Sequence, residues 1–189
     1  MKYIATVALL LNLGVAGIYA HDKPVKMTFS GTGGAAAINL QQPGTANVEE
    51  SETGNGTFGA FTVRVISAET TSPQSSSTCS GPTHLYAIRV AGGAVLRLED
   101  GSLLMMTVTE GSDCVDLAAQ QGHCTLTFQI KSGTGRFANA SGVLTLTETV
   151  LPVAPDVFGN PVFFADTGEL TGTVSGVARE QDDDRDERH

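Results

Sequence analysis

Basic residues are scarce in this chain of 189 residues, which has 11 lysines and arginines against 20 aspartates and glutamates. The formal net charge at pH 7 is −9. A surface of that sign repels phosphate backbones, so nucleic acid is not an expected partner. The last segment, residues 179–189, contributes six acids and three arginines. We expect it to form a disordered acidic tail, with a cation site at Asp182–Asp184 as the less favoured interpretation.

Long hydrophobic runs are absent beyond the N-terminus. Met1-Lys2 is followed by an apolar stretch from Tyr3 to Ala16 and by Gly17-Ile18-Tyr19-Ala20, which is the pattern of a secretory signal peptide. The stretch is too short to span a bilayer. We therefore predict a signal peptide over residues 1–20, a secreted or periplasmic protein, and no membrane span.

Cysteine occurs only three times, as Cys79, Cys114 and Cys124. No Cys-x-x-Cys pair is present and only His123 lies close to a cysteine in sequence, which argues against a zinc site, and no metal site is predicted. Export favours oxidation, so we expect at least one disulfide. Cys114 and Cys124 flank one loop and form the simplest pair, with Cys79 to Cys114 as the alternative.

Sequence signatures of common hydrolases are missing as well. The chain has no Gly-x-Ser-x-Gly elbow, no His-Glu-x-x-His motif and no plausible catalytic triad. Helical periodicity is also missing, because apolar residues recur at every second position rather than at intervals of 3.6. An all-β protein is therefore expected.

Period-two alternation predicts eight strands. Asp100-Gly101 marks a two-residue hairpin, and Gly92-Gly93 is expected to form another. Long loops are expected over residues 31–56, 70–83 and 151–167, and the phenylalanines of the last suggest a lid or plug. The predicted strands are Val25–Ser30, Thr57–Ile66, His84–Val90, Ala94–Glu99, Ser102–Glu110, Cys124–Lys131, Gly142–Val150 and Glu169–Val177.

Eight short strands joined mainly by hairpins make a closed barrel or a sandwich. A closed barrel has no exposed edges, and with about eight strands its interior holds side chains or one small ligand. Threonine and serine occupy the strand positions between the apolar residues, which suits an outer side that faces solvent. We predict one domain over residues 21–178.

A glycine-rich unit, Gly133-Thr134-Gly135-Arg136-Phe137-Ala138-Asn139-Ala140-Ser141-Gly142, joins two of the predicted strands. With the Asp100-Gly101 hairpin before it and the closing strand Gly168–Val174, it resembles the same unit in allene oxide cyclase and dirigent-like barrels and in related secreted bacterial proteins. The resemblance covers roughly Met27 to Val177. This chain has Ser132 where the family pattern usually begins with a further glycine.

The resemblance implies an eight-stranded antiparallel up-and-down β-barrel with an interior ligand cavity. Plant members are often trimeric, so the resemblance also implies a homo-oligomer, a trimer, for this chain. The plant enzymes steer cyclisation or coupling of reactive hydrophobic intermediates, and none of their catalytic residues lies in this unit. Its physical interpretation is structural. Glycines supply positive φ or close backbone approach, Phe137 is expected to be buried at the barrel end, and Arg136 to bind loop carbonyls or a carboxylate. The structural motif residues are Gly133, Thr134, Gly135, Arg136, Phe137 and Gly142.

The candidate site residues are those on the same alternating strand positions as the apolar residues, because these positions are expected to face the barrel interior. Glu148 and Tyr86 are the candidate catalytic pair, because a carboxylate in a dry interior has a raised pKa and can act as a general acid or base. The alternative is that Glu148 pairs with an arginine, and that strand-end residues lie at a wet rim. Those arginines are Arg64, Arg89 and Arg97. The candidate ligand-binding residues are His84, Glu110, Phe128 and Met106.

The leading hypothesis is a secreted barrel that binds a small hydrophobic molecule. Its enzymatic version is an isomerase or cyclase that needs no cofactor. The alternative is a non-catalytic structural or interaction module of the cell exterior, whose interior is filled by its own side chains. Cavity volume distinguishes the two hypotheses.

Overall fold

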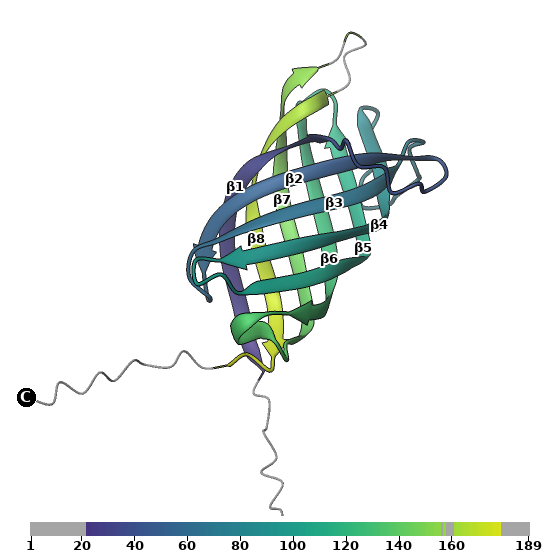
Figure 1. Cartoon of the computed structure of the whole chain (residues 1–189). Helices are drawn as coiled ribbons and strands as arrows, with labels where there is room; N and C mark the ends of the chain where they lie inside the picture. Colours follow the sequence, from purple (N-terminus) through teal and green to yellow (C-terminus); the bar gives the residue numbers. More distant parts are fainter. Residues whose placement is uncertain (1–21, 156, 158–160, 179–189) are drawn as a thin grey trace, which may run out of the picture.

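Eight strands follow one another in chain order around a closed antiparallel barrel (Figure 1). The computed structural model describes residues 22–155, 157 and 161–178, so the expected signal peptide and acidic tail lie outside the described residues. The prediction of an eight-stranded up-and-down barrel is confirmed. The strands are β1 (Lys23–Ala35), β2 (Thr45–Gly56), β3 (Phe61–Thr70), β4 (His84–Leu98), β5 (Leu103–Asp116), β6 (Gln121–Gly133), β7 (Ser141–Pro155) and β8 (Pro161–Ser175).

Two of the predicted strand assignments were wrong although the total of eight is right. The segment 31–56, expected as a loop, holds the end of β1 and all of β2. Conversely, Gly92-Gly93 is not a hairpin, because β4 runs through it as one strand. A Cβ atom at Gly92 would lie 2.6 Å from the Ile66 carbonyl oxygen, so glycine there permits close strand packing rather than a turn.

The expected lid over residues 151–167 is also mostly strand. β7 and β8 pair along this segment and project past the other strands at one end of the barrel (Figure 1). Phe163 is exposed, whereas the Phe164 ring lies over Gly33 inside the barrel. Phe158 lies outside the described residues.

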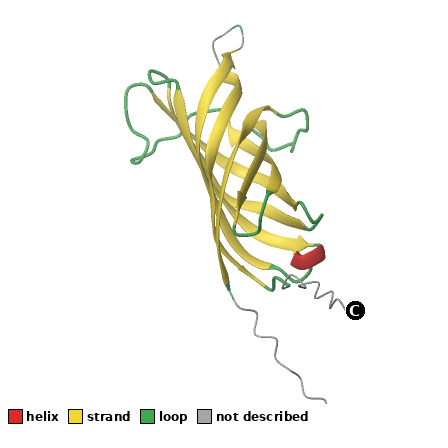
Figure 2. Cartoon of the chain, turned by 90° about the vertical axis from the view of Figure 1, so that its left-hand side faces the viewer, coloured by secondary structure: helices red, strands yellow, loops and turns green. Residues whose placement is uncertain are grey.

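The barrel has a closed end and an open end, and the apolar core fills the closed half. At the closed end a single-turn 3₁₀ helix, η1 (Gly135–Phe137), lies across the strand ends (Figure 2). The open end is where β1 ends and β2 begins. Core side chains exposed by no more than 2% are Met27, Val65, Ala68, Leu96, Leu104, Cys124, Leu126, Phe128, Phe137, Leu144, Leu146, Leu170 and Val174.

The glycine-rich unit forms the closed end, as expected. Phe137 is fully buried and meets the Phe58 ring edge to face, with centroids 5.1 Å apart. The Arg136 guanidinium donates to the Phe58 carbonyl oxygen and forms an ion pair of 3.4 Å with Asp100. Gly135 has φ +58°, and a Cβ atom there would lie 2.3 Å from the Ser102 hydroxyl, so the turn requires glycine. The unit is a structural plug.

The disulfide joins Cys79 to Cys114, so the simplest expected pair, Cys114 with Cys124, was wrong. Cys124 faces the interior and is buried as a free thiol. In the β5–β6 register Cys124 pairs with Asp113 and not with Cys114. Neighbouring residues of a strand face opposite sides, so Cys114 points outward, where the loop after β3 brings Cys79.

Loss of this disulfide is expected to lower stability by about 3 kcal/mol, because the bond closes a loop with a sequence separation of 35 and restricts the unfolded chain. The double variant Cys79→Ala/Cys114→Ala should melt about 10 °C below the parent protein. Thermal unfolding with and without dithiothreitol measures this. Reduction should lower the melting temperature of the parent and leave that of the variant unchanged. A variant as stable as the parent would show that the bond carries no stability.

Among the residues that the structure describes, no helix has the length and apolar character needed to cross a bilayer.

Candidate functional site

A layer of polar side chains crosses the barrel interior between the apolar core and the open end. Every strand from β2 to β8 contributes to it, and we call it the polar layer. Apart from one glutamate near its edge, its members are buried. They are Glu50, Glu52, Ser67, Glu69, Arg89, Asp113, Cys124, Glu148 and Asp166.

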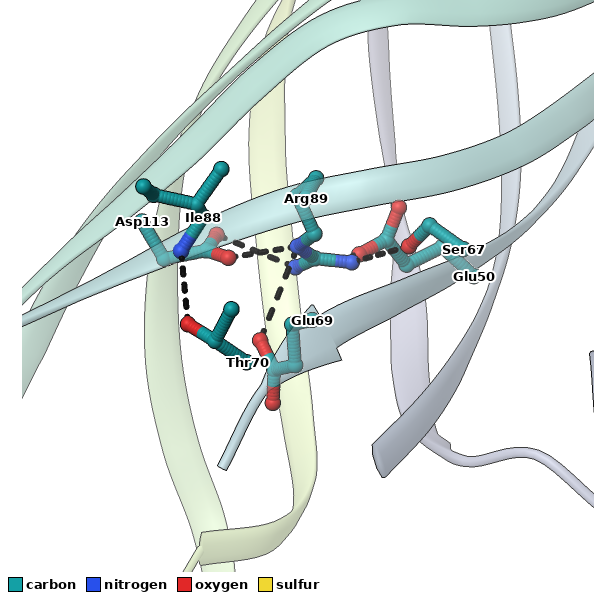
Figure 3. Close-up of polar contacts among 7 residues, drawn as sticks. All are labelled: Glu50, Ser67, Glu69, Thr70, Ile88, Arg89 and Asp113. Carbon is teal, nitrogen blue, oxygen red and sulfur yellow. Dashed lines mark hydrogen bonds and ion pairs between the residues drawn. The ribbon is translucent and has the colours of Figure 1, made fainter. Parts of the chain in front are cut away.

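Arg89 is the centre of this layer (Figure 3). Its guanidinium binds the Asp113 carboxylate through two nitrogens, with Nη2 lying 3.0 Å from Oδ1. The same Nη2 lies 3.2 Å from Glu50 Oε1, and Nη1 donates to the Ser67 hydroxyl. Glu69 is the third acid around Arg89, with its Oε2 atom 3.6 Å from Nε of Arg89. One guanidinium therefore serves three carboxylates from three different strands.

These contacts fix the charges of Arg89 and Asp113. Burial would lower the pKa of Arg89, but the facing charges of Glu50 and Asp113 outweigh it and hold that pKa well above the usual value. For Asp113, burial raises the pKa, but the charge and hydrogen bonds of Arg89 bring it below the usual value. The two residues thus form a charged, buried ion pair.

The remaining acids lack enough positive charge for all of them to ionise. Burial, followed by the neighbouring Glu50 and Asp166, raises the pKa of Glu52 to about 9. Burial, followed by the charges of Glu50, Asp166 and Glu52, raises that of Glu148 to about 9 as well. Burial also raises the pKa of Glu50, against the opposing charge of Arg89. At neutral pH the layer therefore holds protonated carboxyl groups beside the ion pair.

A cavity of about 220 Å³ lies between the polar layer and the open end. Its base carries Arg89, Asp113 and Glu69. Two positions from Glu50, Asp113, Glu148 and Asp166 toward the open end, the inward residue of the same strand is apolar. These residues are Val48, Val115, Val150 and Phe164. The apolar lining is Ala35, Ala46, Val48, Val115, Val150, Pro152, Val162 and Phe164.

Glu69 is the titratable group best placed at this cavity. Its side chain is 28% exposed, and it lines the cavity beside Arg89. Burial raises its pKa to about 7, with the Arg89 charge opposing and the Asp113 charge adding to the rise. A carboxyl group with that pKa can both give and take a proton at neutral pH.

Three of the predicted site residues lie inside the barrel. Glu148 belongs to the polar layer, so its predicted inward orientation is confirmed. Phe128 and Met106 are buried in the apolar core. None of the three belongs to the lining of the 220 Å³ cavity, so their predicted roles at a ligand stay predictions.

The other three predicted site residues lie outside, so their expected inward orientation was wrong. Glu110 is exposed. Val108 of β5 pairs with Phe128 of β6, but the next β6 residue, Thr127, pairs with Glu110, so β5 contains one extra residue at this point. Such a bulge exchanges the inward and outward phases of the strand beyond it. The inward residue is therefore Asp113.

A second irregularity displaces Tyr86 and His84. Ala68 pairs with Ala91 and Glu69 with Arg89, so Val90 is the extra residue on β4. Arg89 consequently points inward. Tyr86 points outward and lies opposite Cys114. His84 is also on the outer side, where its Nε2 atom lies 3.3 Å from Oδ2 of Asp116.

Several residues of the site were missed from the sequence, namely Glu50, Glu52, Glu69, Asp113 and Asp166. From the sequence, Arg89 is expected only as one of three possible ion-pair partners for Glu148. Glu50 and Glu52 share one phase of β2 with Val48, but Glu49 on the opposite phase is acidic as well. The acids therefore do not alternate, and the segment carries no period-two signal of the usual apolar kind.

No protein-family description matches this chain, and no curated protein matches it significantly.

Proposed function

We propose that this chain is an exported barrel that binds a small, mainly hydrophobic molecule in the cavity at its open end. The observation that carries the proposal is the cavity itself: an apolar wall above a base made of Arg89, Asp113 and Glu69. Pockets of this kind bind an apolar body through the wall and orient one polar group through a few fixed side chains. The Cys79–Cys114 disulfide is compatible with an oxidising location.

The volume limits the ligand. A cavity of about 220 Å³ is below the range of about 300–1,000 Å³ typical of sites for drug-sized molecules. The bound molecule is therefore smaller than those ligands, or it extends out of the open end. The polar group it places at the base is one that accepts hydrogen bonds, such as a carbonyl, because Arg89 only donates them.

The enzymatic version of the proposal is a cofactor-independent isomerase or cyclase, as in the allene oxide cyclase and dirigent-like proteins that the glycine-rich unit resembles. Glu69 replaces Tyr86 in this proposal, because Tyr86 lies on the outer side. Glu69 would exchange a proton with the ligand while the Arg89 guanidinium stabilises negative charge on its carbonyl oxygen. The rival hypothesis of a filled interior fits the closed half, which is solid, but it does not account for the cavity above it.

Filling the cavity should abolish ligand binding. The side chain of Val150 lines it, so Val150→Trp is expected to weaken binding of an apolar fluorescent probe, such as 1-N-phenylnaphthylamine, at least tenfold. Val143 lies on the same strand but is 43% exposed, so Val143→Trp is the matched control and should bind as the parent does.

Native mass spectrometry of the exported protein tests for a ligand acquired in the cell. A co-purified molecule present in the parent and in Val143→Trp but absent from Val150→Trp would support the proposal. Equal probe binding by Val150→Trp and the parent, with both variants folded, would overturn it. The catalytic version is tested separately with Glu69→Gln, which should retain the probe and lose turnover of any substrate identified in this way.

A further inference from the structure

Three buried glutamates bring their carboxylate groups to one point in the polar layer. One oxygen from each of Glu50, Glu52 and Glu148 lies within 4.8 Å of the other two. None of the three residues is more than 4% exposed. Among the described residues, five of their six carboxylate oxygens have no hydrogen-bond partner, and the sixth accepts from Arg89. Buried oxygens of this kind normally have a partner, so their convergence needs a physical explanation.

A fourth acid provides independent support. Asp166 on β8 is 2% exposed, and neither of its carboxylate oxygens has a hydrogen-bond partner in the part of the chain that the structure describes. It lies opposite Gly31 of β1, which in turn lies opposite Glu52 of β2. Its charge acts on both Glu52 and Glu148, so this buried side chain faces the three glutamates.

Glycines on the neighbouring strands make the space for these acids. A Cβ atom at Gly31 would lie 2.9 Å from Cγ of Glu52, and one at Gly33 would lie 2.9 Å from Cγ of Glu50. A Cβ atom at Gly168 would lie 2.8 Å from Cβ of Glu148. Each of the three glutamates therefore packs against a glycine on an adjacent strand, where any larger residue would displace it.

We propose that Glu50, Glu52 and Glu148 bind one hard divalent cation, with Asp166 as a further oxygen donor, and that calcium is the ion that fits best. Carboxylate oxygens are the preferred ligands of such ions. The cluster contains no histidine among the described residues, which disfavours zinc and copper. The sequence alone predicted no metal site, so this proposal departs from that prediction.

The geometry is compatible with calcium. Calcium binds oxygens at about 2.3–2.6 Å, so ligands on opposite sides of it lie up to about 5 Å apart. The three glutamate oxygens all lie within 4.8 Å of one another, which is inside that span. Magnesium requires near-octahedral geometry and usually keeps several of its water ligands, so a buried cluster of carboxylates suits calcium better.

The charge of the layer also favours a dication. The polar layer contains six acids, and Arg89 contacts three of them, so it balances only part of their charge. A bound dication would allow the three glutamates to ionise together. The inference does not rest on the proposed function, because none of its four acids lines the cavity.

The experiment uses the full exported chain after removal of metals with a chelator. Addition of 10 mM calcium chloride should raise the melting temperature by about 5 °C, as expected for an extracellular-type site with a millimolar or tighter dissociation constant. Magnesium chloride at the same concentration should raise it less. Equilibrium dialysis with elemental analysis should find one calcium ion per chain that the matched variants below lose.

Glu52→Gln and Glu148→Gln should each lose both the thermal shift and the bound ion. Glu49→Gln is the matched control, since Glu49 is the outward neighbour of Glu50 and contacts Arg64 on the outer side. Melting of each variant in chelator establishes that it folds. The proposal is overturned if calcium leaves the parent unchanged, or if both glutamine variants keep the parent's shift and stoichiometry, which would place the bound ion elsewhere on this acidic chain.

Discussion

Replacing Arg89 with methionine is expected to destabilise the barrel by about 3–5 kcal/mol at pH 8, the cost of breaking a buried ion pair by removing one partner. Arg89 is the shared hydrogen-bond donor of Asp113, Glu50 and Ser67. Without it, these groups stay buried with nothing in the layer to replace the lost charge. Urea unfolding monitored by circular dichroism measures the effect.

The loss should be smaller at pH 5 than at pH 8. In the variant, Asp113 loses the charge that lowers its pKa, so this carboxyl group would take up a proton in the folded state. At low pH, protonation of Asp113 removes the unpaired negative charge from the folded variant. At high pH the folded variant must either bury the charged carboxylate or keep it protonated against the pH of the solution, and both favour unfolding.

Two further substitutions separate charge from geometry. Arg89→Lys keeps a positive charge but cannot bind Asp113 through two nitrogens, so an intermediate loss is expected. Arg64→Met removes an arginine from the outer side of β3, where its side chain is 60% exposed and pairs with Glu49. That change should cost less than about 1 kcal/mol. Equal losses for Arg64→Met and Arg89→Met would contradict the central role of Arg89.

The sequence predicted the fold and the closed end because both depend on local patterns. The alternation on β6 and on β7 up to Val150 is regular in the structure, so Glu148 was correctly placed inside. The conformation of the glycine-rich unit depends on its own residues, such as Gly135 at positive φ. Its contacts with Phe58 and Asp100 come from distant turns, and the sequence predicted only their kind, a buried Phe137 and a carbonyl or carboxylate partner for Arg136.

The bulge on β5 explains one of the site residues that the sequence did not predict, Asp113. Counting by two from Met106 places Glu110 and Cys114 inside, but one extra residue exchanges the phases beyond Val108. Asp113 then turns inward, and Cys114 turns outward toward Cys79. A single local irregularity thus accounts for the outward position of Glu110, the inward position of Asp113, and the outward position of Cys114, which pairs with Cys79. Gly111 follows the bulge directly, and a glycine inside a strand often marks such an irregularity.

The missed strand β2 has a different cause. Strand prediction by alternation relies on apolar inward residues, and the inward positions of β2 include Glu50 and Glu52 instead. Those acids can occupy the interior because other strands supply Arg89 and the packing glycines. The local sequence of β2 does not contain that information.

Stability should fall as the pH rises from about 5 to 9 in metal-free buffer. Glu52 and Glu148 have pKa values of about 9 in the folded chain, against about 4.5 when unfolded. Between these values the folded chain keeps protons that the unfolded chain releases, so each rise in pH favours unfolding. The contribution is fully present below about pH 4.5 and is lost as the pH passes 9. Each group contributes at most about 1.4 kcal/mol per pH unit.

Other members of the polar layer limit the favourable range at both ends. The pKa of Asp113 lies below its usual value, so its contribution is present at neutral pH and is lost in acid. Glu69 and Asp166, with pKa values of about 7 and about 6, add to the decline over the lower part of the range. Maximum stability is therefore expected near pH 5, where Asp113 is ionised and the other acids are largely protonated.

Urea unfolding at intervals from pH 4 to 9, in buffer containing a chelator, measures this profile. The double variant Glu52→Gln/Glu148→Gln cannot ionise at these positions, so its stability should change much less between pH 6 and 9 and should exceed that of the parent at pH 8. Glu49→Gln/Glu110→Gln is the matched control, because both residues lie on the outer side, and it should follow the parent. A parent protein whose stability is constant or rises from pH 6 to 8.5 would show that the two buried carboxyl groups ionise as readily in the folded chain as in water. The polar layer would then have to be hydrated or neutralised in a way that its contacts with Arg89 alone do not provide.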